Sequence, residues 1–137
     1  MKHLFNKYIL LIVAILIAAI AMASVWPYNV ATVRNIAINT KVVKIGDSVS
    51  YSVKSCKFLD ITPDVDRYFI SEHVKLRVIT PIQRINPVGC RTLETLVEVP
   101  KDIPTGIYHI HVVARFKVNI VRAITIEYDT PKFEIIG

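Results

Sequence analysis

Short segments of alternating apolar and polar residues follow one another along most of the chain. The clearest are residues 48–53, 73–78, 92–99, 108–118 and 123–128, where apolar side chains take mostly every second position. This period of two is typical of a half-buried β-strand, because successive side chains of a strand point to opposite faces. Turn-forming residues separate the segments, and the part after residue 30 has no apolar stripe at helical spacing. The pattern predicts an all-β, immunoglobulin-like β-sandwich of about seven strands.

The N-terminus follows a different pattern. Residues 8–25 read YILLIVAILIAAIAMASV, a run without charge that Lys2 and Lys7 precede. About 17 to 25 apolar residues span a bilayer as a helix, and positive charge before the span keeps the N-terminus in the cytoplasm. We therefore expect a transmembrane signal anchor at residues 1–27, embedded in the lipid bilayer, and an exported sandwich at residues 28–137.

A cleavable signal peptide is the alternative interpretation of the same segment. Ala21, Met22 and Ala23 have the small-x-small form of a cleavage site, although the apolar run is slightly long for a signal peptide. Either interpretation exports the rest of the chain.

Cys56 and Cys90 are the two cysteines of the chain. An even count in an exported protein favours a disulfide, because exported proteins fold in an oxidising compartment. Neither cysteine has further metal ligands near it in the sequence, so a zinc site is not expected. Cys56 ends one predicted strand and Cys90 follows a Pro-x-Gly loop, which predicts a bridge at the rim of the sandwich.

Residues 103–108 read IPTGIY and place Tyr108 at the start of the longest predicted strand. This resembles the tyrosine corner of immunoglobulin-like sandwiches, in which the tyrosine hydroxyl bonds to the preceding backbone. An ordinary core tyrosine fits the same pattern.

Candidate catalytic and metal-binding residues are few. His109 and His111 lie on one face of a predicted strand, and even with His73 they would need a precise arrangement to reach the three protein ligands usual for catalytic zinc. Asp60, Asp64 and Asp66 lack the spacing of a calcium-binding loop. The serines lack the Gly-x-Ser-x-Gly turn of a nucleophile. We predict no catalytic residue, no metal and no cofactor, and therefore no enzyme.

Charge placement is the remaining functional signal. Removing Lys2 and Lys7 from the 17 basic residues leaves 15 against 11 acidic ones, a net charge of +4 for the exported part. In an immunoglobulin-type sandwich the third and sixth strands are neighbours, places that we assign to residues 73–78 and 108–118. That assignment predicts one basic outer face, with Glu94 and Glu98 on the opposite sheet. The residues of this basic face are His73, Lys75, Arg77, His109, His111, Arg115 and Lys117.

A basic face of this kind attracts anionic partners. We expect an anionic envelope component, such as lipid headgroups or lipopolysaccharide phosphates, or a protein partner; a plain solvated strand face fits the same residues. Nucleic acid is not expected, because aromatic residues for base stacking do not interleave with the charges. No small-molecule substrate is predicted.

Several motifs occur in order along residues 40–136. They are GDSVSYSV at 46–53, CK at 56–57, Arg67, NPVGC at 86–90, VP at 99–100, IPTGIY at 103–108, FKVN at 116–119 and Arg122. The ordered set resembles a group of small, membrane-anchored proteins encoded by tailed bacteriophages. The resemblance implies a phage gene product with an exported sandwich and two paired cysteines, and it implies no activity.

Together these observations favour a non-enzymatic, membrane-anchored binding or accessory domain that acts at the host envelope. A structural component of a virion or envelope assembly is the alternative. The expected location is the bacterial inner membrane, crossed once, with the C-terminal domain in the periplasm. Cleavage near Ala23 would instead leave a secreted or periplasmic protein.

Overall fold

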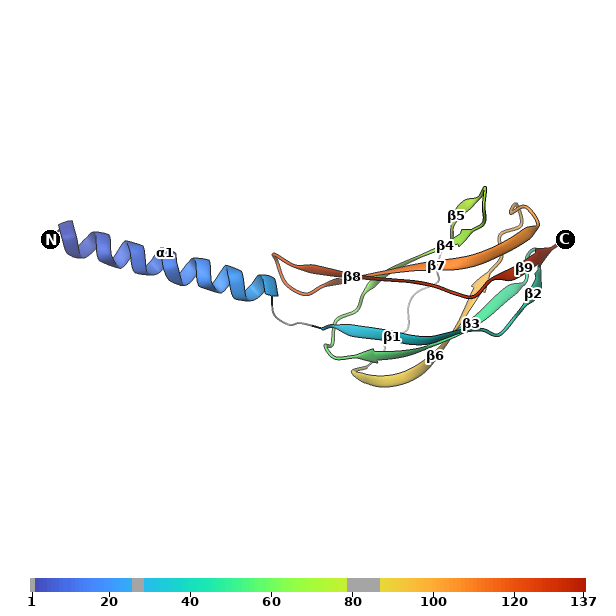
Figure 1. The fold of residues 1–137 in the computed structure, drawn as a ribbon, viewed down its shortest axis with the longest axis horizontal. Coiled ribbons are helices and arrows are strands. Elements are labelled where there is room, and N and C mark those ends of the chain that lie inside the picture. The colour runs from blue at the N-terminus through green and yellow to red at the C-terminus, as the bar shows by residue number, and fades with distance from the viewer. Residues whose placement is uncertain (1, 26–28, 79–86) are drawn as a thin grey trace.

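The computed structural model describes residues 2–25, 29–78 and 87–137. These residues form a β-sandwich of two sheets preceded by one N-terminal helix, as the sequence pattern predicts, with nine strands instead of about seven (Figure 1). The elements are α1 (Lys2–Val25), β1 (Ala31–Ile38), β2 (Val42–Lys44), β3 (Ser48–Lys57), β4 (Asp64–Ile70), β5 (Lys75–Val78), β6 (Gly89–Glu98), β7 (Gly106–Lys117), β8 (Ala123–Asp129) and β9 (Phe133–Ile136).

Helix α1 projects from one end of the sandwich (Figure 1). Its segment Leu4–Val25 has a mean hydropathy of 2.8, and none of its most apolar stretch is buried against the rest of the protein. At 1.5 Å per residue its 24 residues extend about 36 Å, which exceeds the hydrocarbon thickness of a bilayer, about 30 Å. The helix is therefore long and apolar enough to cross a membrane, which both the anchor and the signal-peptide interpretations require.

The two sheets have the strand order of an immunoglobulin-like sandwich. One sheet has the order β1-β3-β6, and the other has the order β2-β9-β7-β4-β5. Strand β8 continues the edge of β7 that β9 begins, because β9 pairs with residues 106–108 and β8 with residues 111–117. All pairs are antiparallel except β2 with β9.

The structure corrects the predicted neighbours of the second sheet. Residues 73–78 and 108–118 are not adjacent, because β4 lies between them and pairs with β5 on one side and β7 on the other. Strand β4 includes Asp64 and Asp66, and its residues are not among the segments that the alternating pattern predicted as strands. The physical reason for the miss is Arg67: it faces inward between Val65 and Phe69 and interrupts the apolar alternation by which a strand is recognised.

The core fills the space between the sheets with the inner faces of both. Tyr51 of the first sheet, with Phe69 and Ile110 of the second, is fully buried. Tyr108 packs edge-on against Phe69, and its hydroxyl donates a hydrogen bond of 2.8 Å to the carbonyl of Pro104. This bond confirms the tyrosine corner.

The predicted disulfide is confirmed. Cys56 and Cys90 are bonded, with their Cα atoms 4.0 Å apart. They are register partners on the neighbouring strands β3 and β6, so the bridge lies within one sheet and not through the core. Cys56 is next to last in β3 and Cys90 is second in β6, which agrees with a bridge at the rim.

Candidate functional site

Six of the seven residues predicted to form a basic face lie on strands of the second sheet. Lys75 and Arg77 lie on β5, and four of the other residues lie on β7, with alternate positions of β7 buried in the core. His73 is exposed in the turn before β5. The structure therefore brings these residues to one side of the sheet, on strands that β4 separates.

Carboxylates interleave with these basic residues. Asp66 of β4 accepts hydrogen bonds from Arg77 Nη2 at 2.5 Å and from Arg115 Nη1 at 3.0 Å. The hydrogen bond from Arg77, helped by the charge of both arginines, holds the pKa of Asp66 below its usual value of 3.8. On strands β4, β5, β7 and β8 the acids of this face are Asp64, Asp66, Glu127 and Asp129, and they match Lys75, Arg77, Arg115 and Lys117 in number. With neutral histidines, this face has no excess of positive charge.

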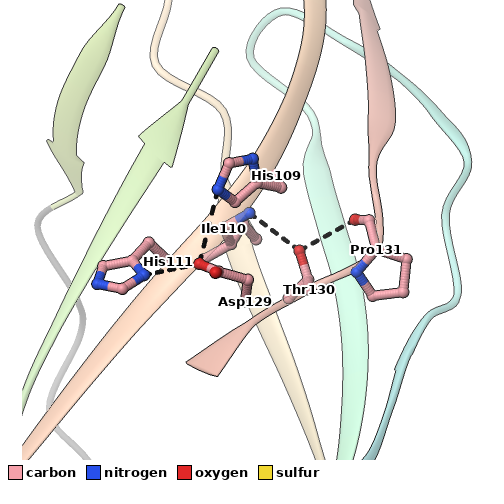
Figure 2. Close-up of polar contacts among 6 residues, drawn as sticks. All are labelled: His109, Ile110, His111, Asp129, Thr130 and Pro131. Atoms are coloured by element: carbon pink, nitrogen blue, oxygen red, sulfur yellow. Dashed lines mark hydrogen bonds and ion pairs between the residues drawn. The ribbon is translucent and has the colours of Figure 1, made fainter. Parts of the chain in front are cut away.

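The two histidines of the His-x-His sequence contact Asp129 on β8 (Figure 2). His111 Nδ1 lies 2.6 Å from Asp129 Oδ1, and His109 Nε2 lies 3.6 Å from the same oxygen. Among the described residues, no group of three or more His, Cys, Asp or Glu side chains could hold a metal ion. Here the pair ties β8 to the outer face of β7.

Thr130 makes the matching contact on the inner side of the same corner (Figure 2). Its buried hydroxyl accepts a hydrogen bond of 2.9 Å from the amide of Ile110 and donates one of 3.1 Å to the carbonyl of Pro131. These bonds fix the point where the chain passes from β8 to β9. The corner is thus held by polar contacts on both faces of the sheet.

A cavity of about 760 Å³ lies between the two sheets. Residues from both sheets line it, and most of the inward-facing ones are apolar. The apolar lining comprises Ala31, Val33, Val53, Val65, Leu93, Val112, Ala114, Phe116 and Ile126. Ala31, Lys57 and Gly89 are register partners at the end of the first sheet from which α1 leaves, and all three line the cavity. The cavity therefore reaches the end of the sandwich that is next to α1.

Arg67 brings a charge to the inner part of this cavity. Arg67 is 8% exposed, and its Nε donates a hydrogen bond of 2.8 Å to the hydroxyl of Tyr51. Its Nη1 is buried and has no hydrogen-bond partner among the described residues. Tyr128 also lines the cavity. Burial, reinforced by the neighbouring Tyr51, raises the pKa of Tyr128 far above its usual value of 10.0, so this hydroxyl stays neutral.

Neither this cavity nor the role of Arg67 as a site residue was predicted from the sequence. A cavity arises from the spacing of two sheets, which no local pattern reports. The sequence does contain one signal for Arg67. It stands at the alternate positions of a strand that Val65 and Phe69 also occupy, so a strand there would point Arg67 inward with them.

Comparison with known proteins gives no family. No family model and no curated protein matches the chain. A Niemann-Pick type C2 protein from the Japanese carpenter ant is similar in structure, with a TM-score of 0.51 and 13% identity over 79% of this chain and 94% of that one. An alkylpurine DNA glycosylase from Pseudomonas fluorescens, bound to DNA, has a TM-score of 0.50 and 11% identity over 87% of this chain but 34% of its own. At these identities the likeness concerns the fold alone.

Proposed function

We propose that this protein is a non-enzymatic binding domain, held at a membrane by α1, that takes an apolar or amphiphilic ligand between its two sheets. The cavity between the sheets is the observation that carries the proposal. Ligand pockets of proteins typically enclose about 300–1,000 Å³, have mostly apolar walls and present few polar groups. The cavity of about 760 Å³ lies within this range, and its lining combines apolar side chains from both sheets with polar ones that include Lys57, Arg67 and Arg91.

The position of the cavity supports an exchange of ligand with the bilayer. Val25 ends α1 and Ala31 begins β1, so at about 3.6 Å per residue their Cα atoms are at most about 22 Å apart. Ala31 also lines the cavity. A ligand that leaves the hydrocarbon region of the bilayer would therefore have only a short distance to cover before it reaches the apolar walls of the cavity. This ligand departs from the expectation of no small-molecule partner, which rested on the sequence alone.

The proposal includes display in the periplasm of a bacterium and, from the motif resemblance, a phage origin with action at the host envelope. The Cys56–Cys90 disulfide supports export, because such bonds persist in oxidising compartments. The apolar helix supports attachment to the inner membrane. The charges on the outer face of the second sheet are balanced, which argues against an anionic partner there. The cavity is therefore the better-supported binding site.

Radiolabelled dodecanol, an uncharged amphiphile, tests the proposal. The full-length chain in nanodiscs of zwitterionic lipid should bind it saturably above empty nanodiscs. Leu93→Trp should weaken binding about fivefold or more, because Leu93 lines the cavity and overpacking a filled site costs about 1–3 kcal/mol.

Thr125→Trp is the matched control, since Thr125 is exposed on β8 and does not line the cavity. Circular dichroism establishes that both variants are folded. Equal binding by both variants, or binding no greater than that of empty nanodiscs, would contradict the proposal.

A further inference from the structure

Arg67 is a buried cation that lacks an anionic partner in the described part of the chain. Its one hydrogen bond is to the neutral hydroxyl of Tyr51, while Nη1 is buried and unpaired. Taking an ion out of water costs several kcal/mol unless a counter-charge and hydrogen bonds compensate for it. The fold therefore maintains a guanidinium inside the cavity at a cost that its own described side chains do not offset.

The acidic groups nearest in the fold are directed elsewhere. Asp66, the preceding residue in β4, points to the opposite face and accepts hydrogen bonds from two surface arginines. Glu94, at the edge of the cavity, accepts a hydrogen bond of 2.7 Å from the Ser50 hydroxyl. Tyr128 remains protonated because burial raises its pKa. Arg67 thus has no anionic side-chain partner in the described part of the chain, while Lys57 and Arg91 are further cations of the lining on the side of α1.

The wall that the second sheet contributes to the cavity changes along its length. Arg67 is in register with Val112 of β7, which is in register with Tyr128 of β8. Beyond Arg67, away from α1, Phe69 and Ile110 are fully buried and close the core. Toward α1 the inward-facing residues of the second sheet are apolar; they are Val65, Ala114, Phe116 and Ile126.

We propose that the ligand of this cavity is a single-chain amphiphile with a carboxylate headgroup, which pairs with Arg67 while its alkyl chain follows the apolar lining toward α1. This inference rests on the proposed function and adds the chemical class of the ligand. A guanidinium presents parallel N–H donors that match the two oxygens of a carboxylate. The unpaired Nη1 of Arg67 is available for such a bond.

The test compares three probes on the full-length chain in zwitterionic nanodiscs, with empty nanodiscs as the blank. Laurate has the carboxylate and the chain, dodecanol has a chain of the same length without charge, and acetate has the carboxylate without the chain. Laurate should bind about tenfold to a hundredfold more tightly than dodecanol, the range expected for hydrogen bonds to a charged group. Acetate should bind far more weakly than either.

Arg67→Met should abolish the preference for laurate over dodecanol, whereas Arg67→Lys should retain part of this preference. Arg77→Met is the matched control, because it removes an exposed arginine from the outer face of the same sheet. This variant should keep the full preference.

A second readout applies to the unmutated chain and covers the case in which Arg67→Met does not fold. The carboxyl carbon of ¹³C-labelled laurate, titrated by NMR, should show a lower pKa when bound to the protein than in empty nanodiscs, because a neighbouring cation favours the carboxylate. An unshifted pKa, or equal affinities for laurate and dodecanol, would overturn the inference while leaving the proposed function standing. Acetate binding as tight as laurate would also overturn it. If neither dodecanol nor laurate binds, the proposed function fails as well.

Discussion

At the scale of single residues, Asp66 and Arg67 show how neighbours in a strand take opposite roles. Asp66 faces water and joins Arg77 of β5 to Arg115 of β7 across the width of β4. Arg67 faces the core and reaches Tyr51 of the other sheet. Because a strand alternates its side chains, the carboxylate that is adjacent in sequence cannot neutralise the buried guanidinium. The ion pairs of the outer face and the unpaired charge of the cavity follow from this geometry.

Asp66→Asn should reduce the stability of the folded chain at neutral pH by roughly 1 kcal/mol or less, since both arginines are largely exposed. The folded-state pKa of Asp66 lies below 3.8, so the ionised carboxylate stabilises the folded state above that pH. This contribution disappears as the pH falls through the lowered pKa. The variant should therefore lose less stability than the natural chain on acidification.

Urea unfolding of the full-length chain at several pH values between about 2 and 6 measures this difference. Asp102→Asn, in the exposed turn after β6, is the control for the removal of one negative charge. Identical acid dependence in Asp66→Asn and in the natural chain would contradict the role given to the arginine pair.

At the scale of elements, the edge strand β6 forms one wall of the cavity. It pairs with β3 along its whole length, from Gly89 opposite Lys57 to Glu98 opposite Ser48. The disulfide joins the two strands near the end where the cavity reaches α1. An edge strand has a partner on one side alone, so this bond restrains a wall that the sheet itself holds from one side.

Replacing Cys56 and Cys90 together by serine should lower the free energy of unfolding by about 2–4 kcal/mol, because the bond closes a loop with a sequence separation of 34. Reduction of the natural chain should have the same effect. Urea unfolding measures both. In the folded, non-reduced protein neither cysteine should react with an alkylating agent, and an unchanged urea midpoint in the double variant would contradict a stabilising role.

At the scale of the whole molecule, an apolar helix and a β-sandwich are joined end to end (Figure 1). The Asn119 amide in the turn after β7 donates a hydrogen bond of 2.8 Å to the carbonyl of Ala23, close to the end of α1. The helix end and the β7–β8 turn are thereby in contact at the end of the sandwich that the cavity reaches. This arrangement suits a binding domain that works against a membrane surface.

Expression of the full-length chain in a bacterium should yield an intact protein that stays in the membrane fraction after alkaline extraction. The expectation rests on a helix long enough to span the hydrocarbon core. N-terminal sequencing of that fraction provides the measurement. A chain that begins at Ser24 would show that the segment is a cleaved signal peptide and that the domain is not anchored.

The amino-acid sequence by itself determined the features that are local along the chain. The period of two predicted strands, the uncharged run predicted the helix, the cysteine count predicted the disulfide, and the corner before Tyr108 predicted the hydroxyl bond to the backbone. These features can be predicted from the sequence because each depends on residues that are close together along the chain or, for the disulfide, on the two cysteines.

The tertiary structure alone decided which strands are neighbours and what lies between the sheets. Strand β4 lies between two segments that were expected to pair, and it places Asp66 among the basic residues of the outer face. The next residue of β4, Arg67, faces the cavity. Strand pairing and the separation of two sheets depend on residues far apart along the chain, so no local pattern along the sequence reports them.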